Sequence, residues 1–213
     1  QSLSSVPLLI GQDFEWGVGM RLDSADRFPY AVTLGAMQGQ NDLIEAMGRV
    51  VARQCKNMGV HINYAPVVDI NNNPNNPVIN FRSFGSDKDK VTAAGLAYMK
   101  GMQSQRILCT AKHFPGHGDT DTDSHYDLPL ISHNRERLLN TELHPFRALI
   151  SEGLSGVMTA HLNIPALEPS PGLASTFSQS IIFKLLREEM GFRGLTFTDA
   201  MEMQGAVKNF PKG

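Results

Sequence analysis

The sequence predicts an α/β fold in which parallel strands close into a barrel. Short apolar runs rich in branched residues alternate with amphipathic segments along the chain, and each run ends in polar or charged residues. Near-continuous apolar strands suit a parallel sheet buried on both faces. The alternation of strands with helices indicates the α/β class.

Five strands are expected, at residues 6–10, 60–70, 107–114, 156–162 and 195–198. The polar residues that follow them are Asp13, Asp69, Lys112 with His113, His161 and Asp199. In an open doubly wound sheet, ligands gather at one switch point, so only some strand ends would carry such residues. In a (β/α)8 TIM barrel, all carboxyl ends face one mouth. The five polar strand ends therefore favour the barrel.

Four helices are expected between these strands, over residues 43–58, 87–105, 133–152 and 181–190. The first carries an apolar stripe at three- and four-residue spacing and stops at Gly59. The last follows Ser178, a suitable N-cap, and ends at Gly191.

Composition excludes several classes of protein. The 213 residues include 19 Lys and Arg and 21 Asp and Glu, for a net charge of −2. This balance argues against nucleic acid as a partner, because phosphate binding needs a basic surplus. No apolar run approaches the ~18 residues of a membrane helix. The two cysteines are too few for a disulfide scaffold. Because the chain begins with Gln1, we expect a processed or trimmed product.

The densest polar stretch covers residues 112–127. A calcium loop fails here, because Ser124 and Leu130 stand where an EF-hand needs Gly and Glu. A phosphate cradle fails because the third Gly of the fingerprint would fall on Asp121. A transition-metal site could draw on His113, His117, Asp119, Asp123 and His125. Their spacing matches no common metal motif, so no metal is expected.

Acid–base chemistry without a metal fits this stretch better. Asp123 lies two residues from His125, and a carboxylate that contacts an imidazole fixes its tautomer and stabilises its cation. Asp199 ends a strand of the buried type and is a second candidate for catalysis. The alternatives are a solvated surface loop for the first pair and a helix cap near Ala200 for Asp199.

Cationic side chains that could contact a ligand follow three other strands. Asp13 and Arg21 lie eight residues apart on a Gly-rich loop, and Arg82 lies in the loop 80–85. Together with Lys112, these arginines could donate hydrogen bonds to hydroxyl or acyl oxygens. Each one alone is more often a surface ion pair.

Taken together, these motifs resemble glycoside hydrolase family 3, in its β-N-acetylhexosaminidase branch. The segment KHFPGHG at 112–118, followed by DSH at 123–125, separates this branch from the β-glucosidases of the family. The segment FTDAM at 197–201 matches the nucleophile strand. Asp13 with Arg21, and NFRSFG at 80–85, match the sugar-binding loops.

The resemblance implies a retaining glycosidase that needs no cofactor. Asp199 would be the nucleophile, and His125 the general acid and then the general base, with Asp123 as its dyad partner. The residues implied to hold the N-acetylglucosamine ring are Asp13, Arg21, Arg82, Lys112 and His113. The implied substrates are terminal β-linked N-acetylglucosamine units of carbohydrates such as peptidoglycan fragments. A periplasmic or exported location is favoured over the cytoplasm.

Other functions remain open on the same residues. A family 3 β-glucosidase or a phosphorylase would share the fold, and a non-catalytic sugar-binding module would share the pocket. Trp16 stands where relatives often have a small residue, so it either stacks on a sugar or packs under its loop.

The length predicts an incomplete barrel. A full eightfold barrel takes about 250 residues, whereas five strands are countable here. We therefore expect residues 1–213 to form a single catalytic barrel domain that lacks N-terminal and C-terminal units. Exposed sheet edges would follow, with self-association or loss of activity in isolation.

Overall fold

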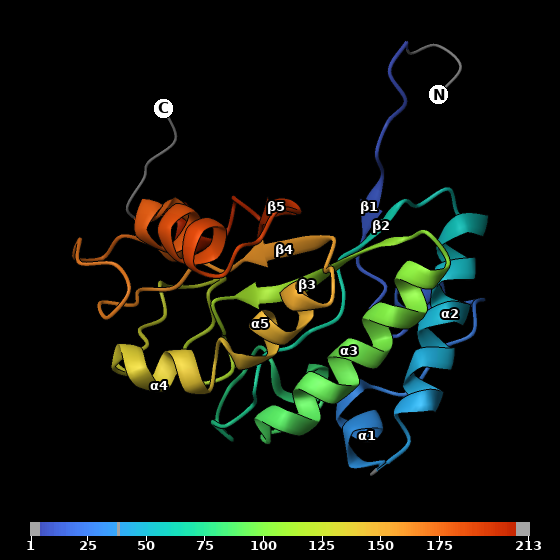
Figure 1. Cartoon of the computed structure of the whole chain (residues 1–213), viewed down its shortest axis with the longest axis horizontal. Helices are drawn as coiled ribbons and strands as arrows, with labels where there is room; N and C mark the ends of the chain where they lie inside the picture. The colour runs from blue at the N-terminus through green and yellow to red at the C-terminus, as the bar shows by residue number, and fades with distance from the viewer. Residues whose placement is uncertain (1–4, 38, 208–213) are drawn as a thin grey trace.

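The computed structural model describes residues 5–37 and 39–207. Figure 1 shows five strands with helices between them. In chain order the elements are β1 (Gly11–Gln12), η1 (Val18–Met20), α1 (Ala31–Ala36), α2 (Asn41–Asn57), β2 (Ile62–Asn63), η2 (Asn80–Arg82), α3 (Lys88–Ser104), β3 (Leu108–Phe114), α4 (Arg135–Asn140), α5 (His144–Ser151), β4 (Gly156–Thr159), η3 (Ser175–Phe177), η4 (Ser180–Glu189), β5 (Leu195–Thr198) and α6 (Gln204–Val207).

The five strands form one parallel sheet in the order β1-β2-β3-β4-β5. Gly11 pairs with Ile62, which pairs with Leu108, and Gly156 pairs with both Thr110 and Leu195. Each strand therefore lies beside the next one in the sequence, without the reversal that defines a doubly wound sheet. The predicted α/β class is confirmed, and the strand order is that of part of a barrel.

Helices α2, α3 and α5 lie together on one side of the strands (Figure 1). The crossing of α2 with α3 is close enough to require glycine. A Cβ on Gly101 would lie 2.1 Å from the Glu45 carbonyl oxygen, and a Cβ on Gly48 would lie 2.6 Å from the Tyr98 carbonyl oxygen. Fully buried side chains such as Val51 fill the space between helices and sheet. This packing fixes the strands whose carboxyl ends carry the polar residues.

Three predicted strands differ from the structure, and the smallest difference is in the strand predicted at 156–162, which ends at Thr159 as β4. Residues 6–10 form no strand, and Val6 and Leu8 are 72% and 62% exposed. This segment projects from the body of the protein (Figure 1), and the Ile10 carbonyl at its end accepts hydrogen bonds from the His61 and Ile62 amides. The predicted strand 60–70 is confined to β2 with a bridge from Val67 to Lys112. Pro66, which has no N–H to donate, interrupts it.

The predicted helices are confirmed except for the third. Residues 133–152 form two helices, α4 and α5, because Pro145 lies in the first turn of α5 and cannot donate to a preceding carbonyl. Before η4, the Ser178 hydroxyl accepts a hydrogen bond from the Ile181 amide (3.0 Å). Gly191 follows η4 with φ +69°. The main chain of η4 has the wide turns of a π-helix.

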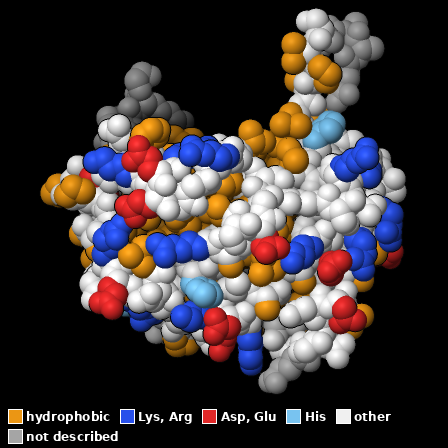
Figure 2. Space-filling model, in the orientation of Figure 1, with side chains coloured by type: hydrophobic (Ala, Val, Ile, Leu, Met, Phe, Trp, Pro, Cys, Tyr) orange, Lys and Arg blue, Asp and Glu red, His pale blue; other side chains and the backbone are white. Residues whose placement is uncertain are grey.

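The surface view agrees with the balanced composition. Figure 2 shows Lys and Arg side chains interspersed with Asp and Glu over the visible face, with no large area of one sign. Within residues 5–37 and 39–207, no helix is long and apolar enough to cross a bilayer.

Candidate active site

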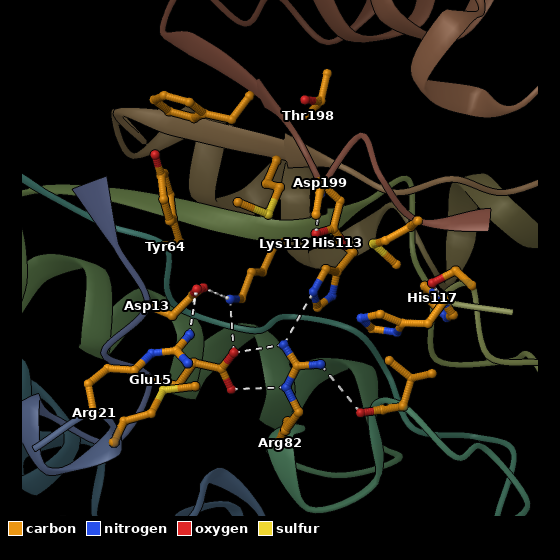
Figure 3. Close-up of a pocket in the computed structure, with 18 residues that line it drawn as sticks. Asp13, Glu15, Arg21, Tyr64, Arg82, Lys112, His113, His117, Thr198 and Asp199 are labelled. Atoms are coloured by element: carbon orange, nitrogen blue, oxygen red, sulfur yellow. Dashed lines mark hydrogen bonds and ion pairs between the residues drawn. The ribbon is translucent and has the colours of Figure 1, made fainter. Parts of the chain in front are cut away.

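A cavity of about 490 Å³ opens at the carboxyl ends of the strands. Its volume is that of a small-molecule site. All but one of the predicted site residues line it, namely Asp13, Arg21, Arg82, Lys112, His113, His125 and Asp199. The exception, Asp123, contacts His125 from outside the lining. The structure therefore brings together residues that lie at or after the ends of four strands, β1, β2, β3 and β5 (Figure 3).

A network of ion pairs forms one wall of the cavity. The ammonium of Lys112 lies 2.7 Å from Asp13 Oδ1 and 2.8 Å from Glu15 Oε1, and its side chain is only 2% exposed. Arg82 donates to both oxygens of Glu15, at 2.7 and 3.1 Å. Arg21 donates to Asp13 Oδ2 at 2.9 Å. Figure 3 shows these five side chains converging on one side of the pocket. The network holds fixed donors and acceptors toward the cavity.

Glu15 is the anion at the centre of this network, and it was not among the predicted residues. Burial by itself raises the pKa of Glu15, but the charges and hydrogen bonds of Lys112 and Arg82 outweigh it and hold that pKa far below its ordinary value. Glu15 follows Asp13 by two residues, and in an extended segment such side chains point to the same side. That spacing is the signal that could have identified it.

Asp69 lies beneath the pocket and orients His113. Its fully buried carboxylate accepts hydrogen bonds from the His113 and His117 amides, at 3.1 and 2.7 Å, and lies 2.7 Å from His113 Nδ1. Burial raises the pKa of Asp69, but His113 and these hydrogen bonds outweigh burial and lower it. An ionised Asp69 accepts a hydrogen bond from His113 Nδ1–H. The other ring nitrogen, Nε2, faces Arg82 at 3.3 Å. Asp69 was expected at a strand end, but it supports the site from below.

Asp123 and His125 form the predicted dyad. Asp123 Oδ1 accepts from the His125 amide at 2.8 Å and lies 2.7 Å from ring Nδ1. Burial raises the pKa of Asp123, but the hydrogen bonds and charge of His125 outweigh burial and lower that pKa overall, so the carboxylate is an anion. Because Nδ1 donates to this anion, Nε2 is the ring nitrogen left for proton transfer. The imidazole is 61% exposed and lines the cavity.

His117 fastens the loop that carries the dyad. Its Nε2 lies 3.1 Å from the Ser124 hydroxyl and its Nδ1 lies 2.9 Å from the Thr120 hydroxyl. Burial, with the charge of His113, lowers the pKa of His117 to about 4, so the ring is neutral. From the other side, the Gly205 amide donates to the Ser124 carbonyl at 3.0 Å. Ser124, between the two dyad residues, is therefore held at both its side chain and its backbone.

Asp199 follows β5 directly. Its amide donates to the Thr159 carbonyl at 2.9 Å, and its Oδ1 accepts from the Ala200 amide at 2.8 Å. Burial raises the pKa of Asp199, but the charges of His113 and Lys112 and the Ala200 hydrogen bond lower it overall. Within the described part of the chain, its Oδ2 accepts no hydrogen bond. The cavity is thus lined by an anionic carboxylate with one oxygen free to react.

Other polar residues singled out in the sequence lie elsewhere. His161 is fully buried and donates from Nε2 to the Ala200 carbonyl at 3.1 Å, so it supports the turn after Asp199. The five residues of the possible metal set do not converge on one point: His113 contacts Asp69, Asp119 contacts His133, and Asp123 contacts His125. Among the described residues, the group that could hold a cation is Asp119, His133 and Glu142, where Arg137 already lies 3.1 Å from Glu142.

Comparisons with known proteins agree with this geometry. The family model described as the glycosyl hydrolase family 3 N-terminal domain matches residues 1–212. The chain is 39% identical to beta-hexosaminidase A of Pseudoalteromonas piscicida, over 96% of the chain and 37% of that protein. It therefore spans well under two thirds of this relative.

Solved structures show the same fold. A family 3 beta-N-acetylglucosaminidase of Paenibacillus sp. FPU-7 superposes with a TM-score of 0.89 at 41% identity, over 96% of this chain and 39% of that one. A beta-glucoside phosphorylase superposes with a TM-score of 0.93 at 28% identity, over 99% of this chain and 40% of the other. These likenesses confirm the barrel assignment for this stretch of chain.

Proposed function

The chain belongs to glycosyl hydrolase family 3, and we propose that residues 1–213 form the catalytic barrel domain of a retaining β-N-acetylhexosaminidase. Its substrates would be carbohydrates with a terminal β-linked N-acetylglucosamine, such as peptidoglycan fragments. The names of the relatives support this substrate class. The observation that carries the proposal is the pairing of two groups on one cavity, an anionic carboxylate at Asp199 and the His125–Asp123 dyad.

In the first step, Asp199 would attack the anomeric carbon with its free oxygen. The bond from that carbon to the leaving oxygen breaks, and protonated His125 gives its Nε2 proton to the leaving oxygen. A covalent glycosyl–enzyme results, as in other retaining glycosidases. Asp123 stays ionised throughout and stabilises the imidazolium before transfer.

In the second step, water would attack the same carbon while neutral His125 removes its proton. The bond to Asp199 breaks and the carboxylate returns. Two inversions retain the anomeric configuration. The polar wall of Asp13, Arg21, Arg82, Lys112 and His113 would hold the sugar hydroxyls during both steps.

Hydrolysis of a chromogenic N-acetylglucosaminide tests the proposal. We expect turnover in which the product keeps the anomeric configuration of the substrate, as measured by NMR. In Asp199→Ala, both turnover and covalent labelling should be lost. Asp23→Ala is the matched control, since Asp23 is exposed and pairs with Arg27 away from the cavity. Turnover in Asp199→Ala, or a product of inverted configuration, would exclude this mechanism. Faster hydrolysis of an aryl glucoside would indicate a β-glucosidase, and sugar binding without turnover a binding module.

Phosphorolysis is a second candidate, favoured by the chemistry of the base. Neutral imidazole does not repel an incoming anion, whereas a carboxylate base would. Lys112 and Arg21 line the same cavity, where both are paired with Asp13. Incubation with substrate and phosphate should then yield a sugar phosphate. Free sugar as the only product at high phosphate concentration would restrict the enzyme to hydrolysis.

A further inference from the structure

The loop that carries the dyad is closed by a contact between its two ends. Asp119 lies before Asp123 and His125 in the chain, and His133 lies after them. His133 Nε2 lies 2.5 Å from Asp119 Oδ2, across 14 positions of sequence. Because an ionised carboxylate only accepts hydrogen bonds, the imidazole N–H is the donor. We call residues 119–133 the dyad loop, and the contact between Asp119 and His133 its clasp.

The chain on either side of the clasp is fixed by other contacts. On the first side, a Cβ on Gly118 would lie 1.8 Å from the Ile70 carbonyl oxygen, so the chain packs closely there against the segment after β2. On the second side, the Ile131 amide donates to the Asn163 carbonyl at 2.9 Å. The clasp therefore joins two points on the body of the protein and limits how far the loop between them can move.

Between these two points the dyad loop is largely exposed. The His125 side chain is 61% exposed, Tyr126 is 78% exposed, and Asp121 is exposed as well. A segment that buries little surface opens at a low free-energy cost. A hydrogen bond at the base of such a loop therefore changes how often His125 faces the cavity.

The clasp is separate both from the cavity and from the neighbouring ion pair. Arg137 donates to Glu142 Oε1 at 3.1 Å and lies 3.8 Å from Asp119, beyond hydrogen-bond distance. Among the described side chains, His133 is thus the hydrogen-bond donor to Asp119. Neither Asp119 nor His133 lines the cavity. A substitution at His133 can therefore act on the loop without changing the groups that would hold the sugar.

From this placement we propose that His133 is a positioning residue, whose hydrogen bond to Asp119 keeps the dyad loop where His125 lines the cavity. The inference rests on the proposed function, because it concerns proton transfer to the leaving oxygen. When the clasp opens, the loop gains conformations in which His125 Nε2 is out of reach of that oxygen. Asp199 and the polar wall belong to other segments and keep their places.

The dependence of kcat/KM on the leaving group separates this role from a merely structural one. We would compare N-acetylglucosaminides with a poor and with an activated aryl leaving group in His133→Leu. For the poor leaving group, kcat/KM should fall about 3- to 10-fold, the range for one partly screened hydrogen bond to a charged group. The activated substrate needs no proton and should keep its kcat/KM. Kd for N-acetylglucosamine should also stay the same, because the wall of the cavity is intact.

Three further variants sharpen the comparison. His133→Gln offers an amide N–H to Asp119 and should restore kcat/KM toward the wild-type value. Asp119→Ala combined with His133→Leu should lose no more than either single variant, since both changes break the same contact. His144→Leu is the matched control, because it breaks another His–Asp pair, with Asp89 on α3 at 3.3 Å, away from the cavity. It should match the wild type.

An unchanged kcat/KM in His133→Leu would overturn the clasp. So would equal losses with both leaving groups, a weakened Kd for the monosaccharide, losses that add in the double variant, or no recovery in His133→Gln. All of these outcomes leave the proposed function standing, provided that the wild-type chain hydrolyses the substrate. No turnover by the wild-type chain would instead remove the proposed function and this inference with it.

Discussion

Asp123→Asn tests how the dyad sets the protonation of His125. The substitution keeps the size of the side chain but removes its charge, and the amide NH₂ can then donate to ring Nδ1 and favour the wrong tautomer. Asp123 makes two short contacts to His125, at 2.7 and 2.8 Å. A hydrogen bond to a charged group contributes about 1.5–3 kcal/mol. Because the imidazole is 61% exposed and Asp123 25% exposed, solvent screening reduces this to about 1–2 kcal/mol.

The expected effect is therefore a loss of about 5- to 30-fold in kcat/KM. The loss should appear with poor leaving groups and shrink with activated aryl groups, which depart without a proton. The assay compares the two kinds of N-acetylglucosaminide across pH. Asp121→Asn, an exposed change on the same loop, is the matched control. Equal losses with both leaving groups, or none, would refute the acid role of the dyad.

Three further substitutions test the supports of the site. Glu15→Gln should lower the free energy of unfolding by about 3 kcal/mol, because it leaves a buried ammonium under-compensated. Urea denaturation measures this. The control is Glu45→Gln, which breaks a half-exposed ion pair with Arg49 on α2 and should stay within about 0.5 kcal/mol of wild type. Because the native pKa of Glu15 lies below its ordinary 4.5, its stabilisation is complete above pH 4.5 and declines as the pH falls further. Asp69→Asn should weaken the charged hydrogen bond that orients the His113 ring, by about 1.5 kcal/mol, and raise KM about tenfold; an unchanged KM would contradict that role. His117, with a pKa of about 4 against 6.5 in the unfolded chain, should make stability fall from pH 6.5 to 4, by up to about 3 kcal/mol. His117→Gln should flatten this part of the curve, and an identical pH dependence would argue against a buried neutral ring.

Local patterns were enough to predict much of the fold. The strand at 195–198 matches β5, and the capped helices at 43–58 and 87–105 match α2 and α3. These elements follow from the spacing of apolar residues and from caps that act within a few positions. The apolar run 6–10 forms no strand and is exposed, because an apolar pattern does not reveal whether the folded chain buries the segment.

By itself, the sequence determined which chemical groups follow each strand. The dyad is an example, because Asp123 and His125 are two residues apart and a short loop can bring them into contact. Only the tertiary structure decided which distant groups meet. Glu15 pairs with Arg82 across 67 positions, and Asp13 with Lys112 across 99. Such contacts depend on how parallel strands align their carboxyl ends, and no local pattern encodes that alignment, so the wall of the site emerged only from the assembled sheet.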